Sequence, residues 1–248
     1  MGMGLILSAP NSGSGKTIIT LGILRALKNK SLNIRSAKSG PDYIDPRFHS
    51  IASGSECYNL DSWAMSKDRL RSISSHDGHL IIEGAMGLFD GAPPCAKGST
   101  AHLAEILNLP IILIMDCSKI SQSIAAVAEG FINFDEKVKI DGVILNKIGS
   151  TKHEKILTTA LFKKNIPVIG CVHRDAQLLL PSRHLGLIQA QEKSNINEFI
   201  EYTANVIEKS IDINTLINLF KNLPQSQLSS TMEPPAQRIS IASDGAFS

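Results

Sequence analysis

Short, continuous apolar runs alternate with stretches of helical length along the chain, and this alternation constrains the fold most. Such runs are typical of parallel strands buried on both faces, because the connecting helices cover the sheet from both sides. We expect strands at 5–8, 34–38, 79–83, 111–116, 142–146 and 168–171, with helices at 16–28, 67–74, 100–107, 121–131 and 153–165. The predicted fold class is α/β, a three-layer, doubly wound and mostly parallel sheet.

The composition changes near residue 224. Two more helices are predicted at 196–211 and 215–223, and the following segment, 224–237, has the low apolar content and the prolines of a linker. Residues 238–242 then alternate like a strand, and a strand needs partners for its backbone groups. We therefore predict a domain over 1–223, a linker over 224–237 and the opening strand of a second domain over 238–248.

Charge and apolar content argue against several classes of protein. The 25 Lys and Arg residues balance 23 Asp and Glu residues, and a net charge of +2 gives no basic surface for nucleic acid or an anionic membrane. No apolar run approaches the ~20 residues of a membrane helix, and no basic stretch precedes the short apolar run near the start. We expect a cytoplasmic protein that binds neither nucleic acid nor membrane.

The four cysteines, Cys57, Cys95, Cys117 and Cys171, are widely spaced and form no C-x-x-C pair. This spacing argues against structural zinc and against a disulfide framework. Cys117 and Cys171 follow apolar strands, where cysteine commonly serves as a small hydrophobic residue.

A glycine-rich loop joins the first predicted strand to the first predicted helix, which is the context of a phosphate-binding loop, or P-loop. Its glycines allow backbone N–H groups to surround a phosphate, and the helix dipole adds positive potential. Lys16 would reach the β- and γ-phosphates of ATP, and Thr17 would hold Mg²⁺. Pro10 replaces the usual first glycine, so an ordinary glycine-rich turn is the alternative. The predicted nucleotide-binding residues of the loop are Gly13, Ser14, Gly15, Lys16 and Thr17.

Two carboxylates follow the second predicted strand, at the sheet edge where α/β proteins bind ligands. Asp42 and Asp45 lie three residues apart, directly before Pro46. The alternative is that Asp45 only caps a helix beginning at Pro46, while Asp42 is only a turn residue.

Further candidates stand at the ends of the third and fifth strands. Glu83 ends an apolar strand near the P-loop, so its carboxylate is placed to bind Mg²⁺ directly or through water. Asp90 lies in the glycine-rich segment that follows, where a simple Asp-Gly turn is the alternative. Asn146, followed by Lys147, resembles the base-reading pair of other P-loop proteins, although Asn146 could merely end its strand.

Five segments together resemble the cobyrinate a,c-diamide synthases, which include the hydrogenobyrinate a,c-diamide synthases. The segments are 12–17, 40–46, 83–91, 142–150 and 180–187, and the likeness is collinear from about residue 5 to residue 192. Segment 59–65 looks closer to the aerobic branch. The resemblance implies a P-loop NTPase fold related to dethiobiotin synthetase. It also implies an ATP-dependent ligase of cobalamin biosynthesis, which amidates the a and c acetates of a corrin polycarboxylate through an acyl phosphate.

The resemblance also implies roles for individual residues. Lys16 and Lys38 would act on the transferring phosphoryl group. The magnesium ligands would be Thr17, Asp42 and Glu83. Asp45 and Asp90 would join the lysines and Asp42 as catalytic groups, and Asn146 would contact the nucleotide. Tyr43, Ile44, Asp45 and Asp90 would lie on the substrate side, where they would orient the acetate and deprotonate the incoming ammonium. His184 and Arg183 would meet substrate carboxylates, with a structural role as the alternative for His184.

The chain departs from this family at its end. The family draws ammonia from glutamine through a C-terminal class I glutaminase domain, and residues 238–248 look like the opening strand of that domain, cut short. None of the four cysteines lies in the Gly-x-Cys-x-Gly turn of its nucleophile. We expect free ammonia or a separate glutaminase domain as the ammonia source, and a homodimer is left open.

Two alternative functions stay open. One is a partitioning or regulatory P-loop ATPase, although that class carries a second lysine where this chain has Asn11. The other is an inactive, truncated fragment of the synthetase.

Overall fold

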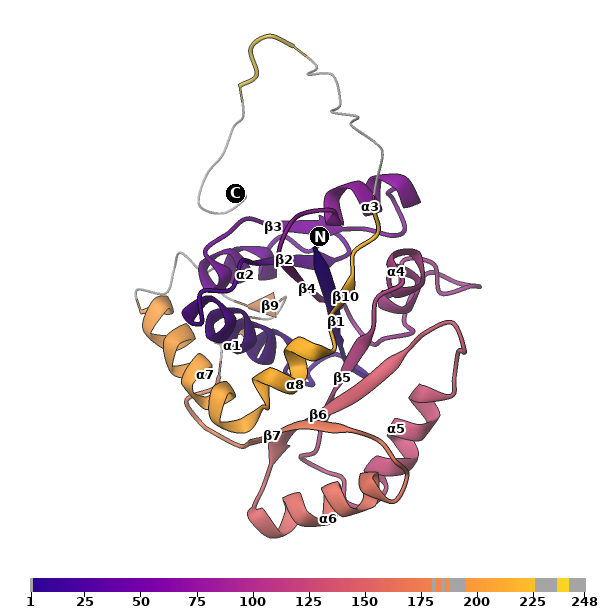
Figure 1. The fold of residues 1–248 in the computed structure, drawn as a ribbon, viewed down its shortest axis with the longest axis vertical. Helices are drawn as coiled ribbons and strands as arrows, with labels where there is room; N and C mark the ends of the chain where they lie inside the picture. Colours follow the sequence, from indigo (N-terminus) through magenta and orange to yellow (C-terminus); the bar gives the residue numbers. More distant parts are fainter. Residues whose placement is uncertain (1, 180–181, 184–185, 188–194, 226–235, 241–248) are drawn as a thin grey trace.

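A sheet of eight strands forms the centre of the computed structural model, which describes residues 2–179, 182–183, 186–187, 195–225 and 236–240 (Figure 1). The strand order is β3-β2-β4-β1-β5-β6-β7, and β10 pairs with β1. Neighbouring strands on the main path are parallel, and β10 runs antiparallel to β1. The strands are β1 (Met3–Ser8), β2 (Ile34–Ser39), β3 (Cys57–Leu60), β4 (His79–Glu83), β5 (Ile111–Asp116), β6 (Ile140–Ile148), β7 (Val168–His173) and β10 (Lys221–Asn222).

Helices cover both faces of this sheet, so the predicted three-layer, doubly wound fold is confirmed (Figure 1). One apolar core lies under α1 (Lys16–Asn29), α2 (Asp45–Ser53), α7 (Ile196–Ser210) and α8 (Ile213–Asn218). The other core lies under α3 (Lys67–Ser74), α4 (Thr100–Leu107), α5 (Ile124–Ile132) and α6 (Thr151–Phe162). Alternate residues of a strand point to opposite faces, so Leu5 and Leu7 of β1 enter the first core and Ile6 enters the second.

All six predicted strands are present, and the differences lie at element ends and in short elements. The prediction missed β3, a four-residue edge strand, and β10. The predicted helix 215–223 was wrong at both ends. Asp212 caps α8 by accepting from the Thr215 backbone N–H at 3.0 Å, and α8 stops at Asn218, before the residues that pair with β1. A small hairpin, β8 (Ser182–Arg183) with β9 (Gly186–Leu187), was not predicted either.

The predicted opening strand of a second domain is not seen in the part of the chain that is described. Residues 236–240 are exposed and lie outside any strand, and residues 241–248 lie outside the described ranges. The domain boundaries at 223 and 238 therefore stay predictions.

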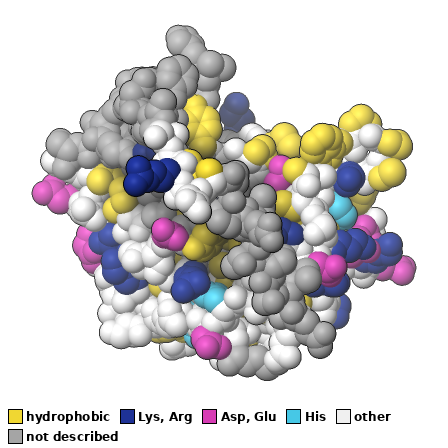
Figure 2. Space-filling view, turned by 90° about the horizontal axis from the view of Figure 1, so that it is seen from above, with side chains coloured by type: hydrophobic (Ala, Val, Ile, Leu, Met, Phe, Trp, Pro, Cys, Tyr) yellow, Lys and Arg dark blue, Asp and Glu magenta, His cyan; other side chains and the backbone are white. Residues whose placement is uncertain are grey.

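The helices and the surface charges bear on the prediction that the protein binds neither membranes nor nucleic acid. In the described ranges, every helix is too short or too polar to cross a lipid bilayer. Figure 2 shows one face, on which basic and acidic side chains are interspersed and hydrophobic side chains gather mainly at one side. This mixture is in keeping with a net charge of +2.

Strand register places the predicted site residues side by side. Lys38 on β2 and Leu7 on β1 are both register partners of Glu83 on β4. The P-loop follows β1 directly, so the carboxyl ends of three adjacent strands converge where the loop begins. This convergence is the position at which open α/β sheets bind ligands.

Candidate active site

The loop between β1 and α1 has the backbone shape of a phosphate cradle. Gly13 and Gly15 have φ values of 80° and 90°, a left-handed conformation that favours glycine. A Cβ on Gly15 would also lie 2.3 Å from Nδ2 of Asn146. The N-cap of α1 is Gly15, which has no side chain to accept a hydrogen bond from the first backbone N–H groups of the helix. The N-terminus of α1 thus lacks a protein side chain as its cap, which suits an anionic ligand.

The ends of β5 and β6 hold this loop from outside. Asn146 Nδ2 donates to the Ser14 carbonyl at 2.9 Å, and Lys147 Nζ donates to the Gly13 carbonyl and to Asp116 Oδ2, each at 2.7 Å. Strand β6 continues to Ile148, so the alternative that Asn146 ends the strand was wrong. Contact between Asn146 and a nucleotide stays a prediction, because its amide here supports the loop.

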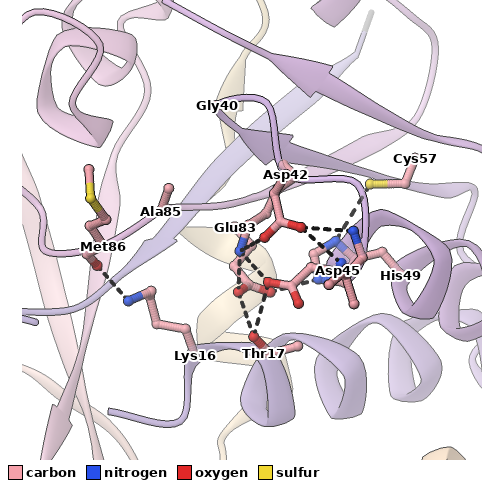
Figure 3. Close-up of polar contacts among 12 residues, drawn as sticks. Lys16, Thr17, Gly40, Asp42, Asp45, His49, Cys57, Glu83, Ala85 and Met86 are labelled. Carbon is pink, nitrogen blue, oxygen red and sulfur yellow. Dashed lines mark hydrogen bonds and ion pairs between the residues drawn. The ribbon is translucent and has the colours of Figure 1, made fainter. Parts of the chain in front are cut away.

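Lys16 is buried and points away from the nearby carboxylates (Figure 3). Its Nζ donates to the Met86 carbonyl at 2.6 Å and to the Asn11 carbonyl at 3.3 Å. Burial lowers the pKa of Lys16 below its usual value, and Lys38 lowers it further against the opposing effect of Glu83. A bound phosphate would give the Lys16 ammonium an anionic partner in place of these backbone carbonyls.

A buried cluster of opposite charges lies beside the P-loop (Figure 3). Lys38 Nζ donates to Asp45 Oδ2 at 2.6 Å and to Glu83 Oε1 at 2.8 Å. The Thr17 hydroxyl donates to the same Glu83 oxygen at 2.8 Å and lies 3.4 Å from Asp45 Oδ2. Lys38, Asp45 and Glu83 are all buried, so their charges must be matched within the cluster.

His49 is a member of this cluster that the sequence analysis missed. Its Nε2 lies 2.6 Å from Glu83 Oε2, both side chains are fully buried, and its Nδ1 lies 3.5 Å from Cys57 Sγ. One signal could have found it, because His49 follows Asp45 by four residues on α2 and therefore shares a face of that helix with it.

The two aspartates after β2 take different positions. Asp42 Oδ1 accepts from the backbone N–H groups of Ile44 and Asp45 at 2.9 Å and 3.3 Å, and its Oδ2 lies 3.8 Å from Lys38. Helix α2 begins at Asp45 itself, so the alternative that Asp45 caps a helix starting at Pro46 was wrong. The Asp42 carboxylate thus stabilises the turn through backbone N–H groups, whereas the Asp45 carboxylate accepts a hydrogen bond from Lys38.

The other predicted residues lie around this centre or outside the described ranges. Asp90 is exposed, and its Oδ2 accepts from the Gly87 backbone N–H at 2.9 Å, which closes a turn. Tyr43 is 63 % exposed, whereas Ile44 packs partly against the core under α1. His184 lies outside the described residues. The substrate-side roles of these residues stay predictions.

The cluster shifts the pKa values of its members in opposite directions. Burial alone would raise the pKa of Glu83, but Lys38 and His49 hold it well below its usual value. Burial and the neighbouring Glu83 raise the pKa of Asp45, against the attraction of Lys38. Burial disfavours the charged forms of Lys38 and His49, but their partners together outweigh it. Glu83 and Asp45 raise the pKa of Lys38, and Glu83 and Cys57 raise that of His49 to about 10.

The oxygens at this site fit Mg²⁺. In the described ranges, no group of three or more His, Cys, Asp or Glu side chains is arranged to hold a metal by itself. Mg²⁺ does not need such a group, because it keeps several waters and is completed by phosphate oxygens. Three oxygens that could serve as metal ligands lie close together: the Thr17 hydroxyl, Asp45 Oδ2 and Glu83 Oε1. The Lys38 ammonium is hydrogen-bonded to the two carboxylate oxygens.

A family model described as the CobQ/CobB/MinD/ParA nucleotide binding domain matches residues 5–188. The chain belongs to this family. The hydrogenobyrinate a,c-diamide synthase of Agrobacterium fabrum (strain C58 / ATCC 33970) is 46 % identical over 251 residues, covering 98 % of this chain and 57 % of that protein. The enzyme of the same name from Brucella ovis (strain ATCC 25840 / 63/290 / NCTC 10512) is 45 % identical over 252 residues, covering 98 % of this chain and 58 % of its own length.

These relatives confirm the resemblance that the five motif segments predicted. The chain spans less than three fifths of the length of each of these two relatives. Among solved structures, chloroplast FtsY from Physcomitrella patens matches with a TM-score of 0.53 at 14 % identity, covering 82 % of this chain and 65 % of that one. This match supports the fold alone.

The histidine in the cluster predicts a pH-dependent contribution to the stability of this nucleotide-binding domain. The pKa of His49 rises from 6.5 to about 10 on folding, so folding favours its protonated form. Its contribution is fully present below pH 6.5 and is lost as the pH rises through about 10. We expect the difference in free energy of unfolding between the wild type and His49→Gln to shrink over this range in urea titrations. A difference that stays constant from pH 6 to pH 10 would contradict the account.

Proposed function

We propose that this domain is the ATP- and Mg²⁺-dependent half of an a,c-diamide synthase. Its substrate would be a cobyrinate- or hydrogenobyrinate-type corrin polycarboxylate, whose a and c acetates become amides. One observation carries this proposal: the P-loop residues Lys16 and Thr17 lie beside a buried centre of Lys38, Asp45 and Glu83 at the ends of adjacent strands. The names of relatives 45–46 % identical over 98 % of the chain support the choice of substrate.

The proposed reaction has two steps. An oxygen of the substrate acetate attacks the γ-phosphorus of ATP, the bond from that phosphorus to the bridging oxygen breaks, and ADP leaves. Ammonia then attacks the carbonyl carbon of the acyl phosphate, inorganic phosphate leaves, and the nitrogen loses a proton to give the amide. Because the acetate and the γ-phosphate are both anions, the protein must neutralise and align them before the first step.

The cationic side chains are suited to this task. Lys16 would turn from the Met86 carbonyl to the β- and γ-phosphates, and Lys38 would accompany the phosphoryl group as it moves to the acetate. Bound Mg²⁺ would neutralise phosphate charge. Thr17, Glu83 and Asp45 would hold the ion. The geometry favours Asp45, whose Oδ2 lies 3.4 Å from the Thr17 hydroxyl, over Asp42, whose Oδ1 accepts from two backbone N–H groups.

Ammonia would come from outside residues 1–248. A glutaminase of the expected type needs a cysteine thiolate as its nucleophile. Cys117 and Cys171 are poorly suited, since burial raises the pKa of Cys117 to about 12 and that of Cys171 to about 11. None of the four cysteines, Cys57 and Cys95 included, lies in the Gly-x-Cys-x-Gly turn of such a nucleophile, so a separate glutaminase domain or free ammonia would supply the nitrogen.

The first test supplies the purified chain with MgATP, a corrin polycarboxylate such as hydrogenobyrinate, and a nitrogen source. We expect mono- and diamides, detected by mass spectrometry, with ammonium chloride but not with glutamine alone. Lys16→Ala should lower the rate at least about 100-fold, because it removes a cation from the γ-phosphate, and its circular dichroism spectrum should match the wild type. ATP-dependent dimerisation in size-exclusion chromatography, without amide at any ammonium concentration, would instead favour a partitioning or regulatory ATPase.

The second test separates the two aspartates. Asp45→Asn should raise the free Mg²⁺ needed for half-maximal binding of a non-hydrolysable ATP analogue by about tenfold or more, because an anionic oxygen at the metal is lost. Asp42→Asn is the matched variant, since an asparagine oxygen can still accept from the backbone N–H groups of Ile44 and Asp45. Calorimetric titrations with the analogue at a series of free Mg²⁺ concentrations would measure this quantity for both variants. A larger effect of Asp42→Asn would return the metal role to Asp42.

A further inference from the structure

We propose that His49 is a positioning residue that fixes the Glu83 carboxylate for magnesium binding, an inference that rests on the proposed use of MgATP. The two oxygens of Glu83 have separate partners. Oε1 faces Thr17 and Lys38, and Oε2 faces only His49 among the hydrogen bonds of the described residues. The His49 contact therefore fixes the orientation of the carboxylate, with one oxygen held by His49 and the other turned toward the P-loop.

The contact is shielded from bulk water. Both side chains have zero exposed surface, and Nε2 of His49 lies 2.6 Å from Oε2 of Glu83. An unpaired carboxylate oxygen in such a place is strongly disfavoured, so loss of the His49 donor would drive the carboxylate toward other partners. The available donors are Lys38 and Thr17, and a carboxylate that rotates onto them presents its oxygens differently to a metal.

The imidazole is itself held in place from two sides. Its Nδ1 lies 3.5 Å from Sγ of Cys57, the first residue of β3, while Nε2 contacts the end of β4. His49 also shares α2 with Asp45, one turn earlier on the same face. The His49–Glu83 contact thus joins the helix that carries Asp45 to the strand that ends in Glu83, the two carboxylates of the proposed metal site.

This arrangement matches a general feature of metal sites. Carboxylates that bind a metal are commonly oriented by hydrogen bonds from residues that do not touch it, and removal of such a partner costs about 10–100-fold in metal affinity. His49 contributes no atom to the oxygen set of Thr17, Asp45 and Glu83, so it acts on the metal only through Glu83.

The test compares His49→Leu, His49→Gln and His49→Asn with the wild type. Each chain is titrated with a non-hydrolysable ATP analogue by calorimetry, at a series of free Mg²⁺ concentrations and in EDTA. We expect His49→Leu to raise the half-saturating Mg²⁺ by about 10–100-fold while the affinity measured in EDTA stays at the wild-type value. His49→Gln should restore most of the Mg²⁺ dependence, since its amide can place an N–H near the position of Nε2, whereas the shorter His49→Asn should not.

The His153→Gln variant is the matched control. His153 lies on α6, where its Nε2 contacts the Ile120 carbonyl at 2.8 Å, and this variant should keep the wild-type Mg²⁺ dependence. Thermal unfolding would confirm that each variant is folded. If His49→Leu does not fold, the comparison of His49→Gln with His49→Asn still decides the outcome.

Three results would overturn the inference. They are an unchanged Mg²⁺ dependence in His49→Leu, equal behaviour of His49→Gln and His49→Asn, and an equal loss of nucleotide affinity with and without Mg²⁺. A wild-type chain that shows the expected Mg²⁺ dependence but forms no amide would contradict the proposed amidation and leave the role of His49 supported. A wild-type chain that binds no magnesium nucleotide would contradict the proposed function itself.

Discussion

The ion pair between Lys38 and Glu83 sets the conditions for the rest of the site. Parallel register makes the two residues neighbours at the ends of β2 and β4, and their charged atoms lie 2.8 Å apart with both side chains buried. Removing one partner of such a buried pair typically costs about 3–5 kcal/mol, because the other charge is left uncompensated. The pair is stable only with further partners, and Thr17, Asp45 and His49 provide them from α1 and α2.

This arrangement gives the site its chemical character. Two anions of the substrates must meet in the proposed reaction, and the domain offers two lysines from different elements, one on the P-loop helix and one on β2. Lys38 already contacts carboxylates, whereas Lys16, within the part of the chain that the structure describes, has only backbone carbonyls as hydrogen-bond acceptors. Lys16 is therefore suited to bind the nucleotide first, and Lys38 is suited to respond when negative charge moves toward the acetate.

Much of this fold could be predicted from sequence, because its strands are buried on both faces and read as continuous apolar runs. Thr17 and Glu83 could be placed for the same reason, since Glu83 ends a strand that the pattern identifies and Thr17 lies in the P-loop motif that follows another. The sequence analysis assigned the metal role to Asp42, whereas the proposed site uses Asp45, because the choice depends on side-chain contacts that residue spacing does not show. His49 belongs to no motif, and the contact between Asn146 and Ser14 joins residues 132 positions apart.

The central claim is that the domain transfers the γ-phosphoryl group of ATP to a substrate carboxylate. Isotope transfer tests this claim most directly, using a corrin polycarboxylate labelled with ¹⁸O in its acetate groups, together with MgATP and ammonium. Because the attacking acetate oxygen leaves with the phosphate, the account predicts one ¹⁸O atom in inorganic phosphate for each amide formed. Amide formed with unlabelled phosphate, or without ADP, would contradict it.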